Sequence, residues 1–132
     1  MPQQPVELIL ARHMAGGLAV PVLLVDAVGD TLYFNEAAEA ILGRRFDEID
    51  ALPFGQRTTL IEPRDLEGRP LPTERLPAVI ALREGRPAHS VFRMNGLDGS
   101  PHVIEATAIP LGSSGGRTLG AMVFLWRAEP TA

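Results

Sequence analysis

The pattern of apolar and polar positions along the chain predicts one antiparallel β-sheet. Short runs rich in β-branched and aromatic residues occupy 21–26, 31–34, 88–95, 102–111 and 118–126. Such runs, bounded by Gly, Asn, Asp or Pro, are typical of strands. Two strands come first and three come last, with helical segments before and between them. This order predicts an α+β fold whose strands form one antiparallel sheet.

Three segments have the spacing of short helices. Residues 6–15 end at a Gly pair, and residues 36–42 follow Asn35, a good N-cap residue, and end at a Gly. Residues 73–84 form the third helix, for which Thr73 is the candidate cap. The sequence therefore predicts one helix before the first strand and two between the second and third strands.

The stretch at 44–72 is harder to interpret. Five prolines between Pro53 and Pro77 disfavour long regular structure, because proline lacks a backbone N–H donor. One helical turn is predicted at 46–49, and the rest is expected to be irregular.

Composition narrows the function classes. The chain has 132 residues, of which 45% are hydrophobic, and a formal net charge of −4. This size and balance predict one globular domain, and a mildly acidic chain without a basic stripe predicts no nucleic-acid partner. The most apolar run, 18–28, is broken by Pro21 and Asp26 and is shorter than the ~20 residues that span a bilayer. We therefore expect a cytoplasmic protein without a membrane partner.

Several motifs in order resemble PAS domains of bacterial signalling proteins. Residues 25–39 read as a strand, a turn with Asp26 and Gly29, a second strand and a helix capped by Asn35. Weaker matches follow at 68–72, 85–87, 98–99, 107–111 and 120–124. The resemblance covers about residues 19 to 127.

The resemblance implies a five-stranded antiparallel sheet in the order 2-1-5-4-3, with helices on one face and an N-terminal helix. It also implies a sensory, non-enzymatic signalling module that binds a small ligand or a protein partner and forms dimers. We expect 1–17 to be the N-terminal helix, 18–127 the PAS domain and 128–132 a disordered tail. Apolar Leu8, Ile9 and Met14 are the candidate dimerisation residues.

One departure from the family concerns the output. Many such domains end in Asp-Ile-Thr, which leads into an effector, whereas this chain reads Trp126-Arg127 at that place. If the chain is a full-length protein, we expect output through a signalling protein in trans or through a homodimer; if it is a fragment, the effector belongs to the rest of the protein.

The resemblance places a pocket between the helices and the inner face of the sheet. The candidate lining residues are Leu24, Phe34, Ile41, Leu76, Val79, Ile80, Met94, Thr107, Met122 and Phe124. A small apolar ligand would suit them, with the Thr107 hydroxyl and the adaptable Met122 side chain as the most specific contacts. The alternative is that these side chains fill a core and leave a pure interaction or dimerisation domain.

Cofactor chemistry is weakly supported, so no cofactor is predicted. The chain has no Cys, which excludes disulfides and a chromophore attached through sulfur. The helix at 73–84 has no His, which disfavours haem. A redox sensor with a non-covalent flavin stays open as an alternative, with Trp126 and Asn95 as contacts. His13, His89 and His102 are too scattered for a metal site.

Catalysis is not indicated by the polar residues. The carboxylates Asp26, Glu62, Asp65 and Glu105 are scattered, and no nucleophile motif or phosphate loop is present. The arginines 44, 45, 57 and 64 could hold an anion, but the nearby acidic residues favour a solvated face.

Overall fold

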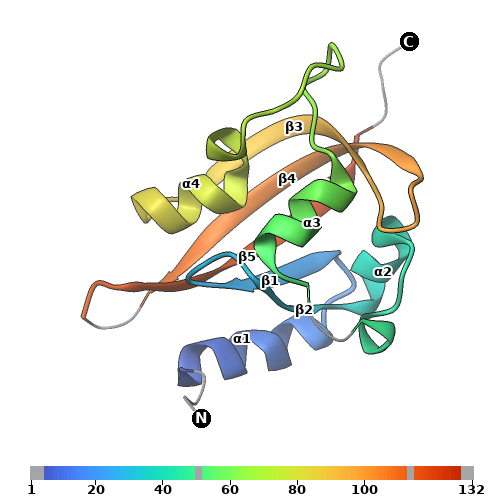
Figure 1. Cartoon of the computed structure of the whole chain (residues 1–132). Coiled ribbons are helices and arrows are strands. Elements are labelled where there is room, and N and C mark those ends of the chain that lie inside the picture. Colours follow the sequence, from blue (N-terminus) through green and yellow to red (C-terminus); the bar gives the residue numbers. More distant parts are fainter. Residues whose placement is uncertain (1–4, 50–51, 113–114, 129–132) are drawn as a thin grey trace.

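A computed structural model describes residues 5–49, 52–112 and 115–128 (Figure 1). The sheet has five antiparallel strands in the order β2-β1-β5-β4-β3, which confirms the predicted order. The strands are β1 (Val22–Asp26), β2 (Thr31–Phe34), β3 (Ala88–Asn95), β4 (Pro101–Gly112) and β5 (Thr118–Arg127). Of the predicted tail at 128–132, residues 129–132 lie outside the described residues.

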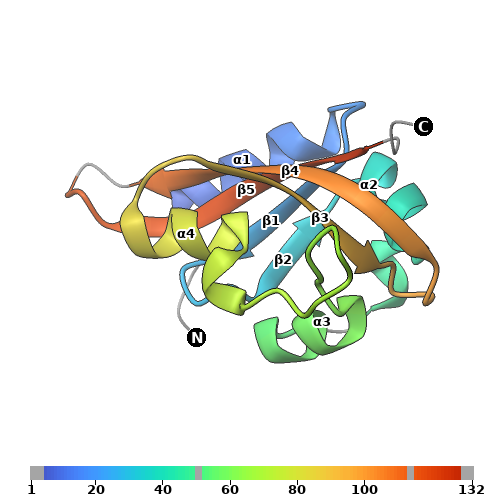
Figure 2. The ribbon, with the colours of Figure 1, turned by 90° about the horizontal axis from the view of Figure 1, so that it is seen from above.

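Helices pack on both faces of the sheet. The helices are α1 (Val6–Gly16), α2 (Glu36–Leu42), α3 (Phe54–Ile61) and α4 (Pro77–Glu84), with 3₁₀ turns η1 (Phe46–Glu48) and η2 (Thr73–Arg75). Apolar residues of α2, α3 and α4 share one core with the inner face of the sheet. The N-terminal helix α1 lies on the opposite side of the sheet from α3 and α4 (Figure 2).

The prediction of an irregular 44–72 was wrong for α3. Its prolines flank the helix instead of interrupting it, since Pro53 is the N-cap and Pro63 follows the C-terminus. The third predicted helix is also divided. Thr73 begins the turn η2 and makes no capping bond, while Pro77 begins α4, where its missing N–H is harmless.

The helix α1 turns one narrow face to the sheet. Leu8 is 2% exposed and packs with Ala11 and Ala15 against the outer face of the sheet. The prediction that Leu8 forms a dimer contact was therefore wrong, because its own domain already buries it. Ile9 and Met14 are more than half exposed.

Asn35 connects α1, β1 and α2. Its side chain is completely buried, and its Oδ1 accepts hydrogen bonds from the backbone N–H groups of Ala38 and Val22, both at 3.0 Å. The two hydrogens of its Nδ2 are shared among three backbone carbonyls at and beyond the end of α1, those of Ala15 (3.0 Å), Leu18 (3.2 Å) and Val20 (2.8 Å). The predicted N-cap is confirmed, and the same amide also fixes the exit of α1.

Candidate functional site

A cavity of about 60 Å³ lies between the inner face of the sheet and the helices α3 and α4. The strands contribute one wall, formed by Leu23, Phe92, Met94, Ala106, Val123 and Leu125. The facing wall includes Arg57 and Ile61 of α3 and Leu76, Pro77 and Ala78 at the start of α4. Protein interiors are close-packed, so a cavity with the volume of about two water molecules is a candidate ligand site.

Two of the predicted pocket residues, Leu76 and Met94, line this cavity. Three others, Phe34, Ile41 and Val79, belong to the inner core around it without lining it. Ile80 is half-buried on α4 and is not among the described lining residues.

The remaining four predictions placed residues on the wrong face of the sheet. Leu24 and Met122 are buried against α1, and Phe124 packs against the same outer cluster. Thr107 lies opposite Phe124 in the β4–β5 register and shares its outer face. Successive side chains of a strand point to opposite faces, so a choice that is wrong by one residue moves the whole set to the other side.

Arg57 is the one charged side chain among the described lining residues. It is 7% exposed, and its Nη1 donates to the carbonyl oxygen of Gly29 and to the Oγ1 of Thr31, both at 2.7 Å. Its guanidinium lies 5.3 Å from the centre of the Phe54 ring. The predicted solvated face was therefore wrong for Arg57.

Burial shapes the electrostatics of this arginine. Desolvation lowers the pKa of Arg57 to about 10, while the nearby charges of Asp30 and Asp26 act in the opposite direction. This pKa is still well above neutrality, so the guanidinium stays protonated at pH 7. The cavity therefore combines apolar walls with one fixed positive charge.

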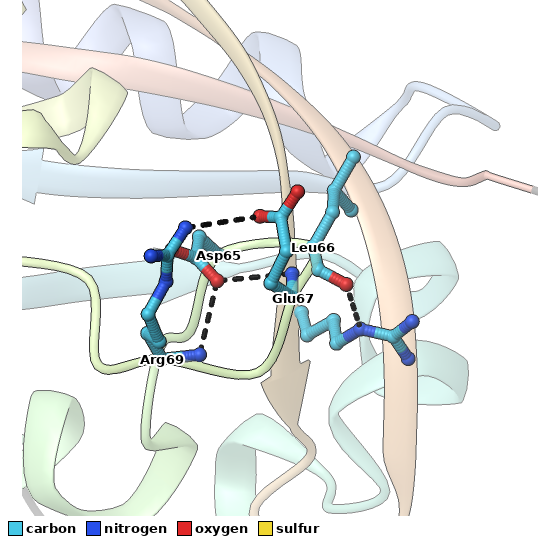
Figure 3. Close-up of polar contacts among 5 residues, drawn as sticks. Asp65, Leu66, Glu67 and Arg69 are labelled. Carbon is cyan, nitrogen blue, oxygen red and sulfur yellow. Dashed lines mark hydrogen bonds and ion pairs between the residues drawn. The ribbon is translucent and has the colours of Figure 1, made fainter.

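The connection between α3 and α4, residues 62–76, is hydrogen-bonded to the edge strand β3 (Figure 3). The Asp65 carboxylate accepts hydrogen bonds from the backbone N–H groups of Glu67 (3.0 Å) and Arg69 (2.9 Å). The bond from Arg69 is the main reason that the pKa of Asp65 is lowered. Arg93 of β3 donates its Nε to the carbonyl oxygen of Leu66 at 3.0 Å. The backbone N–H groups of Arg64 and Arg93 each donate to the other residue's carbonyl oxygen at 2.8 Å, so the connection also pairs backbone groups at the edge of β3.

The two residues considered for a flavin do not face the cavity. Asn95 accepts from Arg64 Nη2 at 3.0 Å, and its Nδ2 lies 3.4 Å from Glu62 Oε2. Trp126 is 41% exposed and stacks on Phe124 of the outer face. Cofactor-sized pockets have volumes of roughly 300–1,000 Å³. Asn95 and Trp126 therefore are not placed to contact a flavin in this cavity, and we derive no flavin chemistry.

The histidines do not meet at this site either. His89 of β3 lies 3.4 Å from Glu105, His13 belongs to α1, and no histidine is among the described residues that line the cavity. Within the part of the chain that the structure describes, no group of three or more His, Cys, Asp or Glu could hold a metal ion. In the same part, no helix has the length and apolar character to cross a membrane.

This sheet order, with α2, α3 and α4 over one face and a cavity beneath them, is the PAS fold, and solved structures agree. A PAS domain from Colwellia psychrerythraea is 17% identical with a TM-score of 0.65, covering 91% of this chain and 97% of that one. The PAS domain of nitrogen regulation protein NR(II) from Vibrio parahaemolyticus is 19% identical with a TM-score of 0.62 over 90% and 98% of the two chains.

A light-oxygen-voltage (LOV) protein of Rhodobacter sphaeroides is also similar. It is 16% identical with a TM-score of 0.71, covering 95% of this chain and 69% of that chain. No protein-family model matches the sequence. No curated protein matches it. At these identities the likeness establishes the PAS fold.

Proposed function

We propose that this protein is a sensory domain that binds a compact small molecule in the cavity beneath α3 and α4. The observation that carries the proposal is the cavity itself, which has a volume of about 60 Å³ and is lined almost entirely by apolar side chains of the inner core. An apolar ligand bound there would remove these side chains from water, which is favourable. The likeness to PAS and LOV structures supports a role in signalling.

Xenon tests whether the cavity admits a guest, because xenon enters apolar cavities without specific polar contacts. We expect xenon pressure to shift the amide NMR signals of Ala106, Val123 and Leu125 in a saturable manner. The Ala106→Val variant, which adds two methyl groups at a lining position, should lose most of this response. Saturable shifts confined to these strands would support the proposal.

The competing function is a pure interaction domain whose core is filled by its own side chains. The small volume of the cavity favours this alternative. An unchanged spectrum under xenon in the wild-type protein would support it and contradict the ligand-binding proposal.

We further propose that the signal leaves through α1 and a homodimer. The solvent side of α1 carries four apolar residues that are more than half exposed, namely Val6, Ile9, Leu10 and Met14. The opposite side of the helix is packed on β1 and β5, so movement of the sheet would move this exposed face. Two copies of one helix can pack against each other by the same surface, which is the commonest arrangement of a homodimer.

Substitutions on this exposed face test the dimer. We expect the wild-type protein to be a dimer in light scattering and the double variant Ile9→Glu, Met14→Glu to be monomeric, because the dimer would bury four charges without partners, two from each protomer. The matched control is Val28→Glu. Val28 is 72% exposed in the turn after β1, so this variant should stay dimeric. A monomeric wild type, or a dimeric double variant, would contradict this part of the proposal.

A further inference from the structure

Residues 52–64, which comprise α3 and the residues on either side of it, form a strap across the inner face of the sheet (Figure 1). The two edge strands of the sheet are β2 and β3, and the strap pairs with both of them. At one end Leu52 pairs with Thr31 of β2, and at the other end Arg64 pairs with Arg93 of β3. The cavity lies between α3 and the strands, and therefore beneath the strap.

The β2 end of the strap is anchored to the turn between β1 and β2 and to the start of β2. The backbone N–H of Thr31 donates to the carbonyl oxygen of Leu52 at 3.1 Å. The backbone N–H of Phe54 donates to Asp30 Oδ1 at 2.9 Å. The buried guanidinium of Arg57 adds its two hydrogen bonds to the same part of the chain. We therefore expect this end to act as the hinge of the strap.

The β3 end of the strap is held in a strained state. Arg64 and Arg93 exchange two backbone hydrogen bonds of 2.8 Å, but the chain reaches Arg64 through Glu62, whose φ is 43°. This left-handed conformation is unfavourable for residues other than glycine, and within the described ranges Glu62 alone among such residues has a positive φ. Arg64 Nε is also buried without a hydrogen-bond partner among the described residues, which is a second cost. Opening this end would relieve both costs, because Glu62 would leave the left-handed region and water would reach Nε.

We propose that the strap is the gate of the cavity, and that its β3 end opens to admit the ligand while its β2 end stays in place. This inference rests on the proposed function, because it describes how a guest reaches the same cavity. Ile61 precedes Glu62 at the end of α3, is 8% exposed and lines the cavity, so movement of this end away from β3 would remove part of the cavity wall. Local openings of this kind occur without global unfolding, and backbone strain is concentrated in segments that move or bind.

Amide hydrogen exchange measures the opening of the strap. We expect the amides of Arg64 and Arg93, which bond across the β3 end, to exchange at least about tenfold faster than those of Ala106 and Val123 in the inner strands β4 and β5. Xenon at about four times its dissociation constant should slow the exchange of the Arg64 and Arg93 amides about fivefold, because only the closed strap retains the guest.

A disulfide across the β3 end tests the gate directly. The chain has no cysteine, so the double variant Arg64→Cys, Arg93→Cys would form a single bridge. Opposed residues that exchange two backbone hydrogen bonds have Cα atoms about 5.5 Å apart, which suits a disulfide. We expect oxidation to slow the exchange of xenon between water and the cavity about tenfold, measured by xenon NMR, and reduction to restore the rate. The matched control is Val91→Cys, Glu105→Cys, a pair opposed in β3 and β4 on the outer face, whose oxidation should leave the rate unchanged.

The Glu62→Gly variant tests the strain. Glycine adopts a positive φ without the steric cost, so the closed strap should become more stable and the Arg64 amide should exchange about fivefold more slowly. The control Glu84→Gly makes the same change at the last residue of α4, where the backbone is helical, and should not slow this exchange.

The outcomes separate this inference from the function on which it rests. Exchange of the Arg64 and Arg93 amides as slow as that of the inner strands would overturn the gate and leave the cavity as a ligand site. A rate of xenon exchange that the oxidised bridge leaves unchanged would do the same. Faster exchange of the Arg64 amide in Glu62→Gly would also overturn the inference, because the positive φ would then not be a cost of the closed state. Absence of xenon binding to the wild-type protein would overturn the proposed function and the gate together.

Discussion

Replacing Asn35 by leucine is expected to lower the free energy of unfolding by about 4 kcal/mol, measured by urea denaturation. The side chain is completely buried and forms hydrogen bonds with five backbone groups. Leucine has a similar size but leaves these groups without partners. Each buried unsatisfied group costs about 1–3 kcal/mol, and relaxation recovers part of the sum.

Two further variants give this expectation its controls. Asn35→Asp keeps the acceptor that caps α2 but loses the Nδ2 donors, so its loss should be intermediate. Asn95→Leu removes a half-buried amide at the end of β3 and should cost less than about 1 kcal/mol. Equal losses for the leucine variants at the two positions would show that Asn35 does not connect α1 to the sheet as described.

The sequence indicated one of the two roles of Asn35. Its place before an apolar helical segment predicted the cap of α2, since capping depends on local spacing. Its bonds to Ala15, Leu18 and Val20 could not be predicted in this way. They depend on how α1 packs on the sheet, which local sequence does not specify.

The burial of both faces of β1 and β5 explains why the prediction of the pocket residues was partly wrong. A strand with one solvated face alternates between apolar and polar residues, as in β3, where the buried Phe92 and Met94 flank the exposed Arg93. In β1 the four residues 22–25 are all buried, because helices cover both faces. A continuous apolar run carries no information about which residues face the cavity.

The burial of Arg57 was not predicted, for a related reason. Pro53 was interpreted as a helix breaker, so α3 was not expected and its arginine was placed with the solvated charges near Asp47 and Glu48. In the structure α3 packs beside the turn after β1, where Arg57 bonds the Gly29 carbonyl and the Thr31 hydroxyl. Burial of an arginine depends on such distant partners, and only the known preference of proline for helix starts could have suggested this helix.

The Leu24→Ala variant is expected to lose about 3 kcal/mol of unfolding free energy while its binding of xenon is unchanged. Leu24 is 0% exposed beneath α1, and truncating a core leucine costs about 2–5 kcal/mol. Leu24 does not line the cavity, so xenon should contact the same lining residues in the variant as in the wild-type protein. Leu125→Ala, on a strand at the inner face, should also be destabilised but should enlarge the cavity and alter the xenon response.

The matched control for the stability change is Leu60→Ala, at a position 44% exposed on α3, which should change the free energy of unfolding by less than about 0.5 kcal/mol. Urea denaturation and xenon NMR on the same three variants separate the two faces of the sheet. The placement of Leu24 beneath α1 would be wrong if Leu24→Ala altered the xenon response as strongly as Leu125→Ala. An unchanged stability would contradict its burial, because a buried leucine cannot lose most of its side chain without losing contacts.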